Sequence, residues 1–313
     1  MSREPGGENT ASSTWTVGKM LAWAGPFLTQ RGSESGRLDA ELLLSEVLQL
    51  RRLDLYVGHD LPIEGGELAL FKALIKRRAN AEPVAYILGR KAFHAIDLEV
   101  GPGVLVPRPE TEHLVDRVLG HFAHDPPAGS RVDGPIIDVG TGSGAIALAI
   151  ATALRANDDA RTVYGVDVSK DALAYAHRNL EVLGLPGVSL GQGDLLGPFA
   201  GAGPFAAIVS NPPYIRAARM ATLPRTVATF EPAGALNGGH DGLDMLNRLA
   251  ALVPSGLVAG GLFAVELSDA AQGRPVVQAL SERGMRDARF ERIGPGPTGL
   301  VIATRAPAEA LQP

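Results

Sequence analysis

The sequence predicts an α/β protein with a seven-stranded, mostly parallel sheet, a small all-helical N-terminal domain and a β-hairpin that joins them. Beyond residue 133, short apolar segments alternate with segments of helical period, and this alternation specifies a mostly parallel sheet covered on both faces. Nearer the N-terminus, apolar residues recur at helical spacing without strand-like alternation. The 313 residues suffice for one large domain and one small one.

Composition narrows the class of protein. The chain is 45% hydrophobic and 20% charged, which is typical of globular proteins, and it lacks cysteine, which excludes disulfides, thiolate metal sites and cysteine nucleophiles. We expect a cytoplasmic protein without membrane contact, because no apolar run reaches roughly 18 residues and the N-terminus lacks the pattern of a signal peptide. The net charge of −5 argues against a surface that binds phosphate backbones, so no direct nucleic-acid partner is expected.

The first part of the chain predicts a short lead-in and then helices. Residues 1–13 are rich in Gly, Ser, Glu and Thr and are expected to be disordered, whereas residues 14–91 are expected to form the helical domain. Its apolar positions at helical spacing are Val17, Met20, Leu21, Ala24, Phe27 and Leu28, then Ala40, Leu43, Leu44 and Val47, then Leu68, Phe71 and Ile75. Basic residues between Lys72 and Lys91 form either a solvated helix face or a contact for an acidic partner.

Residues 92–107 predict the hairpin linker. Alternating segments at 93–100 and 104–106 are separated by Gly101-Pro102-Gly103, which predicts the turn. The remaining residues, 108–313, form the large domain, whose first helix is expected to start at Thr111 or an adjacent residue.

Strands and helices then alternate to the C-terminus. Strands are expected at 136–139, 163–168, 188–192, 206–210, 261–267, 288–293 and 300–304, and helices at 143–155, 170–183, 243–252 and 270–283. Sheets of this kind bind ligands outside the carboxyl ends of their strands, so the residues that follow each strand are the candidate site.

Residues 136–145 run from a buried strand through a glycine turn into a helix, which is typical of a nucleoside-binding loop. Gly140, Gly142 and Ala145 fit the loose dinucleotide pattern G-x-G-x-x-A, and Asp167 lies 22 residues beyond Ala145, where an acid holds ribose hydroxyls. A nicotinamide-binding fold therefore stays open at this point.

Acids near the other strand ends refine this hypothesis. Asp138, before the first glycine, favours a cationic ligand portion and would repel a pyrophosphate. Asp194 and Leu195 follow the third strand and could hold an adenine amino group and cover its face, although Asp194 could equally be a turn residue. No metal site is expected, because the spacing of His94, His113, His121, His124 and His177 matches no ligand pattern. Ser143 lacks the spacing of a nucleophile elbow.

The tetrapeptide Asn211-Pro212-Pro213-Tyr214 follows the apolar run 205–210. The prolines end the strand and hold nearby carbonyls outward, Asn211 offers a side-chain acceptor, and Tyr214 adds an aromatic face. This set suits a planar NH2 group, either of an adenine or of an amide. The alternative is a rigid turn with no ligand.

With these pieces in place, the sequence resembles the class I S-adenosylmethionine-dependent methyltransferases. Within them it is similar to the PrmC/HemK family of glutamine methyltransferases that act on peptide chain release factors. The resemblance extends from about Arg37 over nearly the whole remaining chain, and its motifs lie at 37–44, 107–112, 138–149, 211–214 and 230–232. It implies a Rossmann-like methyltransferase sheet and a helical domain that recognises the release factor.

The resemblance also implies roles for particular residues. Gly140, Thr141, Gly142, Ser143 and Gly144 would line the methionine and ribose portions of S-adenosylmethionine, Asp167 would hold the ribose, and Asp194 and Leu195 would lie at the adenine. Asn211 would contact both the cofactor and the substrate. The glutamine would be bound by Asn211, Pro212, Pro213 and Tyr214, with Asn211, Pro212 and Tyr214 as the catalytic set and S-adenosylhomocysteine as the product. The chain departs from the family at Leu195, Ser268 and 294–299, where an aromatic residue, a glycine and a polar turn are usual.

Besides the nicotinamide-binding dehydrogenase that the glycine loop leaves open, three alternatives remain to the transfer of methyl to the glutamine of a release factor's Gly-Gly-Gln motif. The substrate could be a glutamine of a ribosomal protein or the amino group of adenine in nucleic acid, and the protein could be a binding module without activity. The release factor is the expected protein partner, and the protein is expected to be a monomer without a metal.

Overall fold

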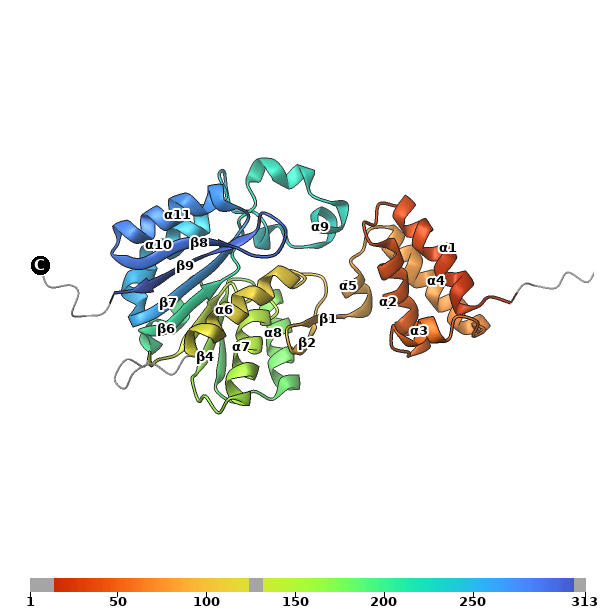
Figure 1. Ribbon diagram of the computed structural model, residues 1–313, viewed down its shortest axis with the longest axis horizontal. Helices are drawn as coiled ribbons and strands as arrows, with labels where there is room; N and C mark the ends of the chain where they lie inside the picture. Colours follow the sequence, from red (N-terminus) through yellow and green to blue (C-terminus); the bar gives the residue numbers. More distant parts are fainter. Residues whose placement is uncertain (1–13, 124–131, 307–313) are drawn as a thin grey trace, which may run out of the picture. The chain divides into compact units, whose positions relative to one another are not determined.

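The computed structural model describes residues 14–123 and 132–306, and Figure 1 shows the arrangement of the helices and strands. The chain divides into two compact units between Leu88 and Gly89. The prediction for residues 1–13 lies outside the described residues. In the described part of the chain, no helix combines the length and the apolar character that a membrane span requires.

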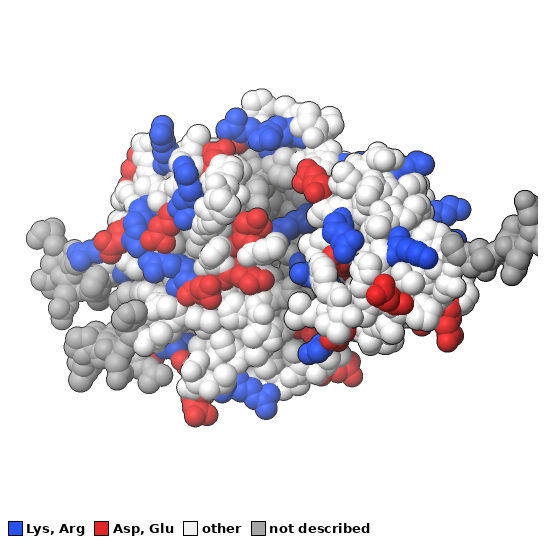
Figure 2. Space-filling view, turned by 45° about the vertical axis from the view of Figure 1, so that its right-hand side comes forward, with Lys and Arg blue, Asp and Glu red and all other residues white. Residues whose placement is uncertain are grey.

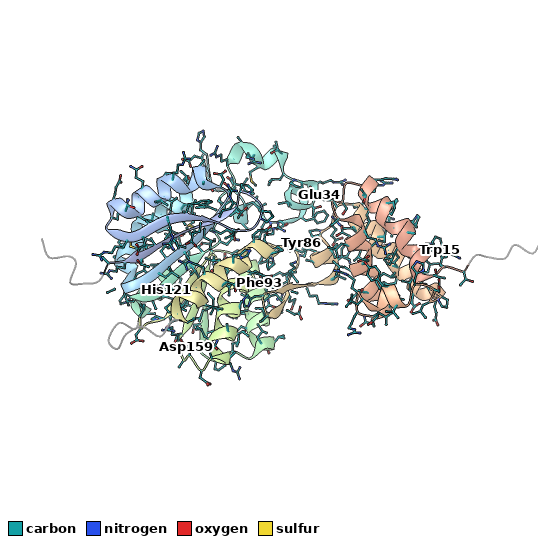
Figure 3. All side chains as sticks on the ribbon, in the orientation of Figure 1. Trp15, Glu34, Tyr86, Phe93, His121 and Asp159 are labelled. Carbon is teal, nitrogen blue, oxygen red and sulfur yellow. The ribbon has the colours of Figure 1, made fainter. Side chains whose placement is uncertain are left out.

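The first unit is helical, as predicted. Its helices are α1 (Val17–Gln30), α2 (Gly36–Leu48), α3 (Asp54–Val57), α4 (Gly65–Ala79) and α5 (Val84–Leu88). The apolar positions at helical spacing form its core, in which Met20, Leu43 and Phe71 are completely buried. Tyr86, marked in Figure 3, is buried on α5.

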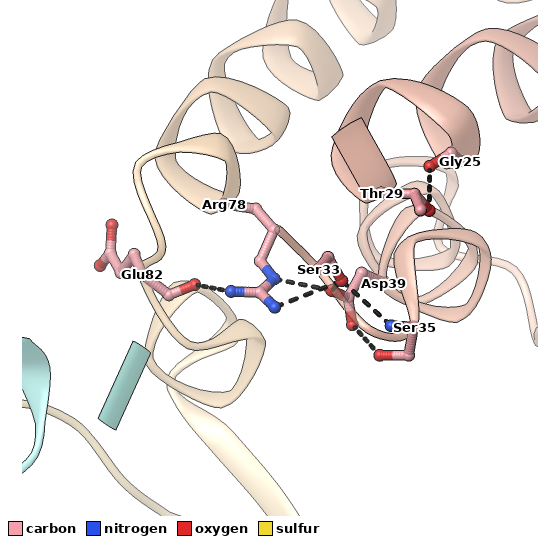
Figure 4. A network of polar contacts seen from close by, with 7 residues as sticks. All are labelled: Gly25, Thr29, Ser33, Ser35, Asp39, Arg78 and Glu82. Atoms are coloured by element: carbon pink, nitrogen blue, oxygen red, sulfur yellow. Dashed lines mark hydrogen bonds and ion pairs between the residues drawn. The ribbon is translucent and has the colours of Figure 1, made fainter. Parts of the chain in front are cut away.

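A buried polar network joins α2 to α4 in this unit (Figure 4). Asp39 of α2 accepts hydrogen bonds from Ser33 Oγ at 2.6 Å, Ser35 Oγ at 3.1 Å and Arg78 Nε at 2.7 Å. Arg78 also donates to the Glu82 carbonyl oxygen. Arg78, which belongs to the predicted basic cluster, is therefore a structural residue, since a buried carboxylate needs such partners.

The hairpin prediction was wrong in its register. Strands β1 (Arg90–Phe93) and β2 (Ile96–Glu99) pair antiparallel, with Phe93 opposite Ile96, so the turn lies at His94 and not at Gly101-Pro102-Gly103. His94 has a φ of 51°, which a two-residue hairpin turn requires. The turn was misplaced because Gly101-Pro102-Gly103 is a stronger turn signal than His94-Ala95. Phe93, marked in Figure 3, is buried and lies opposite the buried Ile96. Residues 104–106 form no strand.

The second unit contains the predicted seven-stranded sheet, in the order β5-β4-β3-β6-β7-β9-β8. The strands are β3 (Ile136–Val139), β4 (Val163–Asp167), β5 (Val188–Gln192), β6 (Phe205–Ser210), β7 (Leu257–Leu267), β8 (Met285–Arg292) and β9 (Gly299–Arg305). The first five are parallel, and β9 pairs antiparallel with both β7 and β8.

Helices cover both faces of this sheet (Figure 1). One face carries α6 (Glu112–Phe122), α7 (Ala145–Ala156) and α8 (Lys170–Leu183), and the other carries α10 (Asp244–Gly256) and α11 (Ala270–Glu282). The shorter elements are η1 (Pro109–Thr111), η2 (Gly197–Ala202), η3 (Ala217–Thr222), α9 (Arg225–Phe230) and η4 (Ala233–Ala235). The core between α10, α11 and the sheet includes the completely buried Ile208, Phe263 and Val301.

The strand order creates a switch point between β3 and β6. The chain proceeds from β3 to β4 and β5 on one side and returns to β6 on the other side of β3. Val139 and Ser210, the last residues of these two strands, lie opposite each other. The glycine loop and Asn211 therefore emerge together at the carboxyl edge, where sheets of this class bind ligands.

Candidate active site

The glycine loop turns sharply between β3 and α7. Gly142 has a φ of 59°, and its N–H donates to Asp167 Oδ2 at 2.9 Å. Gly144 has a φ of 86°, and a Cβ there would lie 2.7 Å from Leu148 Cδ1. Positive φ and the close helix leave little choice but glycine at these positions.

This loop forms one wall of a cavity at the carboxyl edge of the sheet. The cavity is lined by residues of four segments: Val104, Leu105, Pro107 and Thr111; Gly140, Thr141, Gly142, Ser143, Ala145 and Ile146; Asp167, Val168, Ser169 and Ala172; and Asn211, Pro232, Gly234 and Ala235. Asp167 is held there by two backbone N–H groups, from Gly142 and, at 2.8 Å, from Ser169. A fixed carboxylate beside apolar walls suits a nucleoside, whose hydroxyls need an acceptor and whose base needs apolar contact.

Asp138 lies beneath the loop and does not line this cavity. Its side chain is completely buried and accepts hydrogen bonds from Thr141 Oγ1 at 2.6 Å and from the Ala147 N–H at 3.2 Å. Its Oδ1 atom has no partner among the described residues. Burial raises the pKa of Asp138 to about 7, the two hydrogen bonds oppose this rise, and Asp167 adds to it.

Because the pKa of Asp138 is raised, we expect the free energy of unfolding to depend on pH. Between the ordinary pKa of an aspartate and about 7, the folded protein binds a proton at Asp138 that the unfolded chain has lost, so the free energy of unfolding falls as pH rises. We expect Asp138→Asn to lack this slope and to gain about 2–3 kcal/mol relative to the parent protein between pH 5 and pH 8. Urea unfolding of both proteins across this range checks the prediction, and parallel pH profiles would contradict it.

Asn211, the first residue after β6, separates the cavity from a second one. Asn211 lines both cavities. The other residues that line the second cavity are Leu105, Arg108, Pro212, Tyr214, Ile215, Leu223, Val227, Ala235 and Leu236. Asn211 Nδ2 donates to Thr111 Oγ1 at 3.0 Å. Within the described residues, neither Asn211 Oδ1 nor the Pro212 carbonyl oxygen accepts a hydrogen bond, so both acceptors are available to a ligand.

Tyr214 is anchored at both its hydroxyl and its backbone. The hydroxyl donates to Glu266 Oε1 at 3.1 Å, and the carbonyl oxygen accepts from Gln272 Nε2 at 2.9 Å. Burial raises the pKa of Tyr214 far above its usual range, and the adjacent Glu266 carboxylate raises it further. Tyr214 is therefore a neutral ring, held in place, that lines the second cavity.

An ion pair between a partly exposed arginine and a buried glutamate joins two of the sequence motifs beside these cavities. Arg108 Nη2 lies 2.6 Å from Glu231 Oε1, and the Val106 N–H donates to Glu231 Oε2 at 3.3 Å. The Glu231 side chain is almost completely buried. Because residues beside both partners line the cavities, this pair holds the segment around Pro107 against the segment after Pro232.

Three residues predicted to bind the cofactor, Gly144, Asp194 and Leu195, are not among those that line the cavity of the glycine loop. Asp194 is half-exposed and forms an ion pair with Arg248, and Leu195 is buried in the core of the sheet. Neither lines the cavity of the glycine loop. Their contact with adenine stays a prediction.

The histidines show no arrangement for a metal. His94 Nε2 lies 3.2 Å from Asp116 Oδ1, and His121, marked in Figure 3, lies 3.2 Å from the Gly260 carbonyl oxygen. Over residues 14–123 and 132–306, no group of three or more His, Asp or Glu side chains could hold a metal ion.

Sequence reasoning missed Thr111, Glu266 and Gln272 as members of the site. Thr111 was noted as a helix start and falls within the motif 107–112, but neither it nor Glu266 or Gln272 was given a role in the site. A signal was present, since a glutamate at the end of the apolar strand β7 must be buried and must therefore be paired.

Known proteins with similar sequences identify the family. Residues 19–89 match the model described as PrmC N-terminal domain, and residues 121–233 match the model described as Methyltransferase small domain. A release factor glutamine methyltransferase of Rhodopirellula baltica is 40% identical over 281 residues, which cover 88% of this chain and 91% of that protein. The chain belongs to the release factor glutamine methyltransferase family.

Further comparisons agree with this family and its fold. The release factor glutamine methyltransferase of Geobacter sulfurreducens is 40% identical over 273 residues, which cover 87% of this chain and 91% of that protein. Among solved structures, the hMettl16 catalytic domain in complex with MAT2A 3'UTR hairpin 6 covers 74% of this chain with a TM-score of 0.53 and 16% identity. That likeness shows the methyltransferase fold. The predicted PrmC/HemK resemblance is thus confirmed.

Proposed function

We propose that this protein transfers a methyl group from S-adenosylmethionine to the side-chain amide nitrogen of the glutamine in the Gly-Gly-Gln motif of peptide chain release factors. The observation that carries the proposal is the position of Asn211, which lies in a wall that the two cavities share and whose Oδ1 accepts no hydrogen bond from a described residue. The glycine loop and Asp167 suit the cofactor in the first cavity. Pro212 and Tyr214 suit a planar amide in the second.

The residues at this wall account for the chemistry. An amide nitrogen is a poor nucleophile because its lone pair is delocalised into the carbonyl group. Asn211 Oδ1 and the Pro212 carbonyl oxygen accept the two N–H hydrogens, which fixes the nitrogen and stabilises its developing positive charge. When bound, the cofactor supplies a methyl group whose bond to sulfur breaks as its bond to this nitrogen forms. No general base is needed beforehand, since the methylated nitrogen loses a proton readily.

A substitution at Asp167 tests whether the first cavity binds S-adenosylmethionine. We expect Asp167→Asn to weaken the binding of S-adenosylmethionine about 10–100-fold, because an amide replaces a charged acceptor of hydroxyl groups and places a donor against backbone N–H groups. Isothermal titration of both proteins measures the effect. Asp171→Asn, on the exposed side of α8, is the matched control. Unchanged affinity in Asp167→Asn would place the ribose elsewhere.

The alternative substrates need a direct comparison. The protein, labelled S-adenosylmethionine and one acceptor are incubated together, the acceptor being a purified release factor, ribosomal proteins or adenine-containing nucleic acid. We expect label on the release factor. Label on another acceptor would overturn the proposed substrate, and cofactor binding without any transfer would favour a binding module. Figure 2 shows basic and acidic side chains interspersed on the face in view, an arrangement that does not favour nucleic acid.

The remaining expectations follow from this function. Modification of a translation factor takes place in the cytoplasm, where translation occurs. A monomer is expected because one chain supplies both cavities, and sedimentation of the purified protein tests this state.

A further inference from the structure

We propose that Thr111 and Glu266 are positioning residues that fix the orientation of the Asn211 side-chain amide, so that its oxygen and not its nitrogen faces the substrate. This inference rests on the proposed function and concerns residues to which the motifs gave no such role. Three elements contribute to it, because Thr111 precedes α6, Asn211 follows β6 and Glu266 lies on β7.

Thr111 occupies an unusual position for its hydroxyl. It is the N-cap residue of α6, where a threonine side chain usually accepts a hydrogen bond from the first turn, but here the side chain makes no such bond. Its Oγ1 instead lies 2.7 Å from Glu266 Oε2 and 3.0 Å from Asn211 Nδ2. The hydroxyl is buried and lies between the carboxylate and the amide.

The carboxylate determines the direction of these hydrogen bonds. An ionised carboxylate can only accept, so the Thr111 hydroxyl must donate its single hydrogen to Glu266. The Thr111 oxygen then has only lone pairs to offer Asn211, and these select the amide nitrogen as the neighbour. Asn211 Oδ1 is thereby turned toward the cavities. In the opposite orientation, the Asn211 NH2 would meet the substrate NH2, and two donors cannot bond.

Glu266 is well placed for this role. Its side chain is 1% exposed and accepts from both Thr111 and Tyr214. Burial raises the pKa of Glu266, the hydrogen bonds from Thr111 and Tyr214 lower it, Glu110 raises it, and Arg108 lowers it. Because the ionised form sets the orientation, methyl transfer should decline as pH falls through this raised pKa. Glu266→Gln should be slow and should lack this part of the pH profile.

The main test compares Thr111→Val with Thr111→Ser. Valine keeps the shape without the hydroxyl, and we expect about a 10–100-fold lower kcat on a release factor with the Kd for S-adenosylmethionine within about 3-fold of the parent value. Serine keeps the hydroxyl and should retain kcat within about 3-fold. Thr152→Val, which removes a hydroxyl that donates to the Leu148 carbonyl oxygen in α7, is the matched control and should turn over normally.

A double-variant cycle separates positioning from general damage. If Thr111 acts through Asn211, then Thr111→Val added to Asn211→Ala should lower kcat by less than about 3-fold beyond Asn211→Ala alone. Full additivity of the two losses would overturn the inference, as would normal kcat in Thr111→Val. Glu266→Gln provides the second variant if Thr111→Val does not fold. Failure of the proposed function would look different, because the parent protein itself would then transfer no methyl to the release factor.

Discussion

Replacing Asn211 with alanine is expected to lower the rate of methyl transfer to a release factor about 10²–10³-fold, as when one preorganised hydrogen-bonding group is removed from an active site. The loss arises because Asn211, which lines both cavities, no longer offers an acceptor to the substrate nitrogen. The affinity for S-adenosylmethionine should fall much less, since the glycine loop and Asp167 remain.

Single-turnover transfer and isothermal titration measure these two quantities separately. Asn157→Ala is the matched control, because the side chain of Asn157 is exposed and donates to the Ala153 carbonyl oxygen at the end of α7. Near-normal transfer by Asn211→Ala would remove Asn211 from the catalytic set. If the affinity for S-adenosylmethionine fell by the same factor as the transfer rate, Asn211 would bind the cofactor without a separate role in catalysis.

Replacing Arg108 with alanine is expected to destabilise the second unit by about 1–3 kcal/mol, because the buried Glu231 carboxylate would lose its partly exposed charged partner. Within the described residues, the Val106 N–H, 3.3 Å from Glu231 Oε2, would then be the remaining hydrogen-bond partner of this carboxylate. Both cavities should loosen together, since the segments joined by this pair line both of them.

The stability of the second unit must be measured with a probe that lies in that unit. Trp15 and Trp23, which are the 2 tryptophans of the chain, both lie in the helical unit, so calorimetry and hydrogen exchange of the Val106 amide are preferable to tryptophan fluorescence. Arg108→Met combined with Glu231→Leu removes both charges and should recover most of the lost stability. If Arg108→Ala alone unfolds like the parent protein, the ion pair does not hold these segments.

The centre of the sheet was predictable from sequence because strands such as β3 and β6 are buried on both faces and therefore form nearly continuous apolar runs, as in Phe205–Ser210. The hairpin register was missed because Gly101-Pro102-Gly103 carries the stronger turn signal and competes with His94-Ala95, which forms the turn between Phe93 and Ile96. The choice between them depends on the left-handed conformation of His94, which the sequence does not mark with glycine or asparagine.

The site was predictable where a motif lies within one segment. The glycine loop and Asn211 follow directly from strand ends. Thr111 and Glu266 lie 155 positions apart in the chain, and only the fold brings their side chains within hydrogen-bond distance. Asp194 was predicted as a ligand residue because it follows a strand, which stays a prediction, and local pattern could not reveal its ion pair with Arg248 on α10.

The central claim is that the wall at Asn211 holds a glutamine side chain for methylation. The most direct measurement incubates the purified protein with S-adenosylmethionine and a release factor and then analyses the release-factor peptides by fragmentation mass spectrometry. We predict the mass increase of one methyl group on the glutamine of the Gly-Gly-Gln peptide, present with the parent protein and nearly absent with Asn211→Ala. An unmodified glutamine, or a methyl group on any other residue, would contradict the claim.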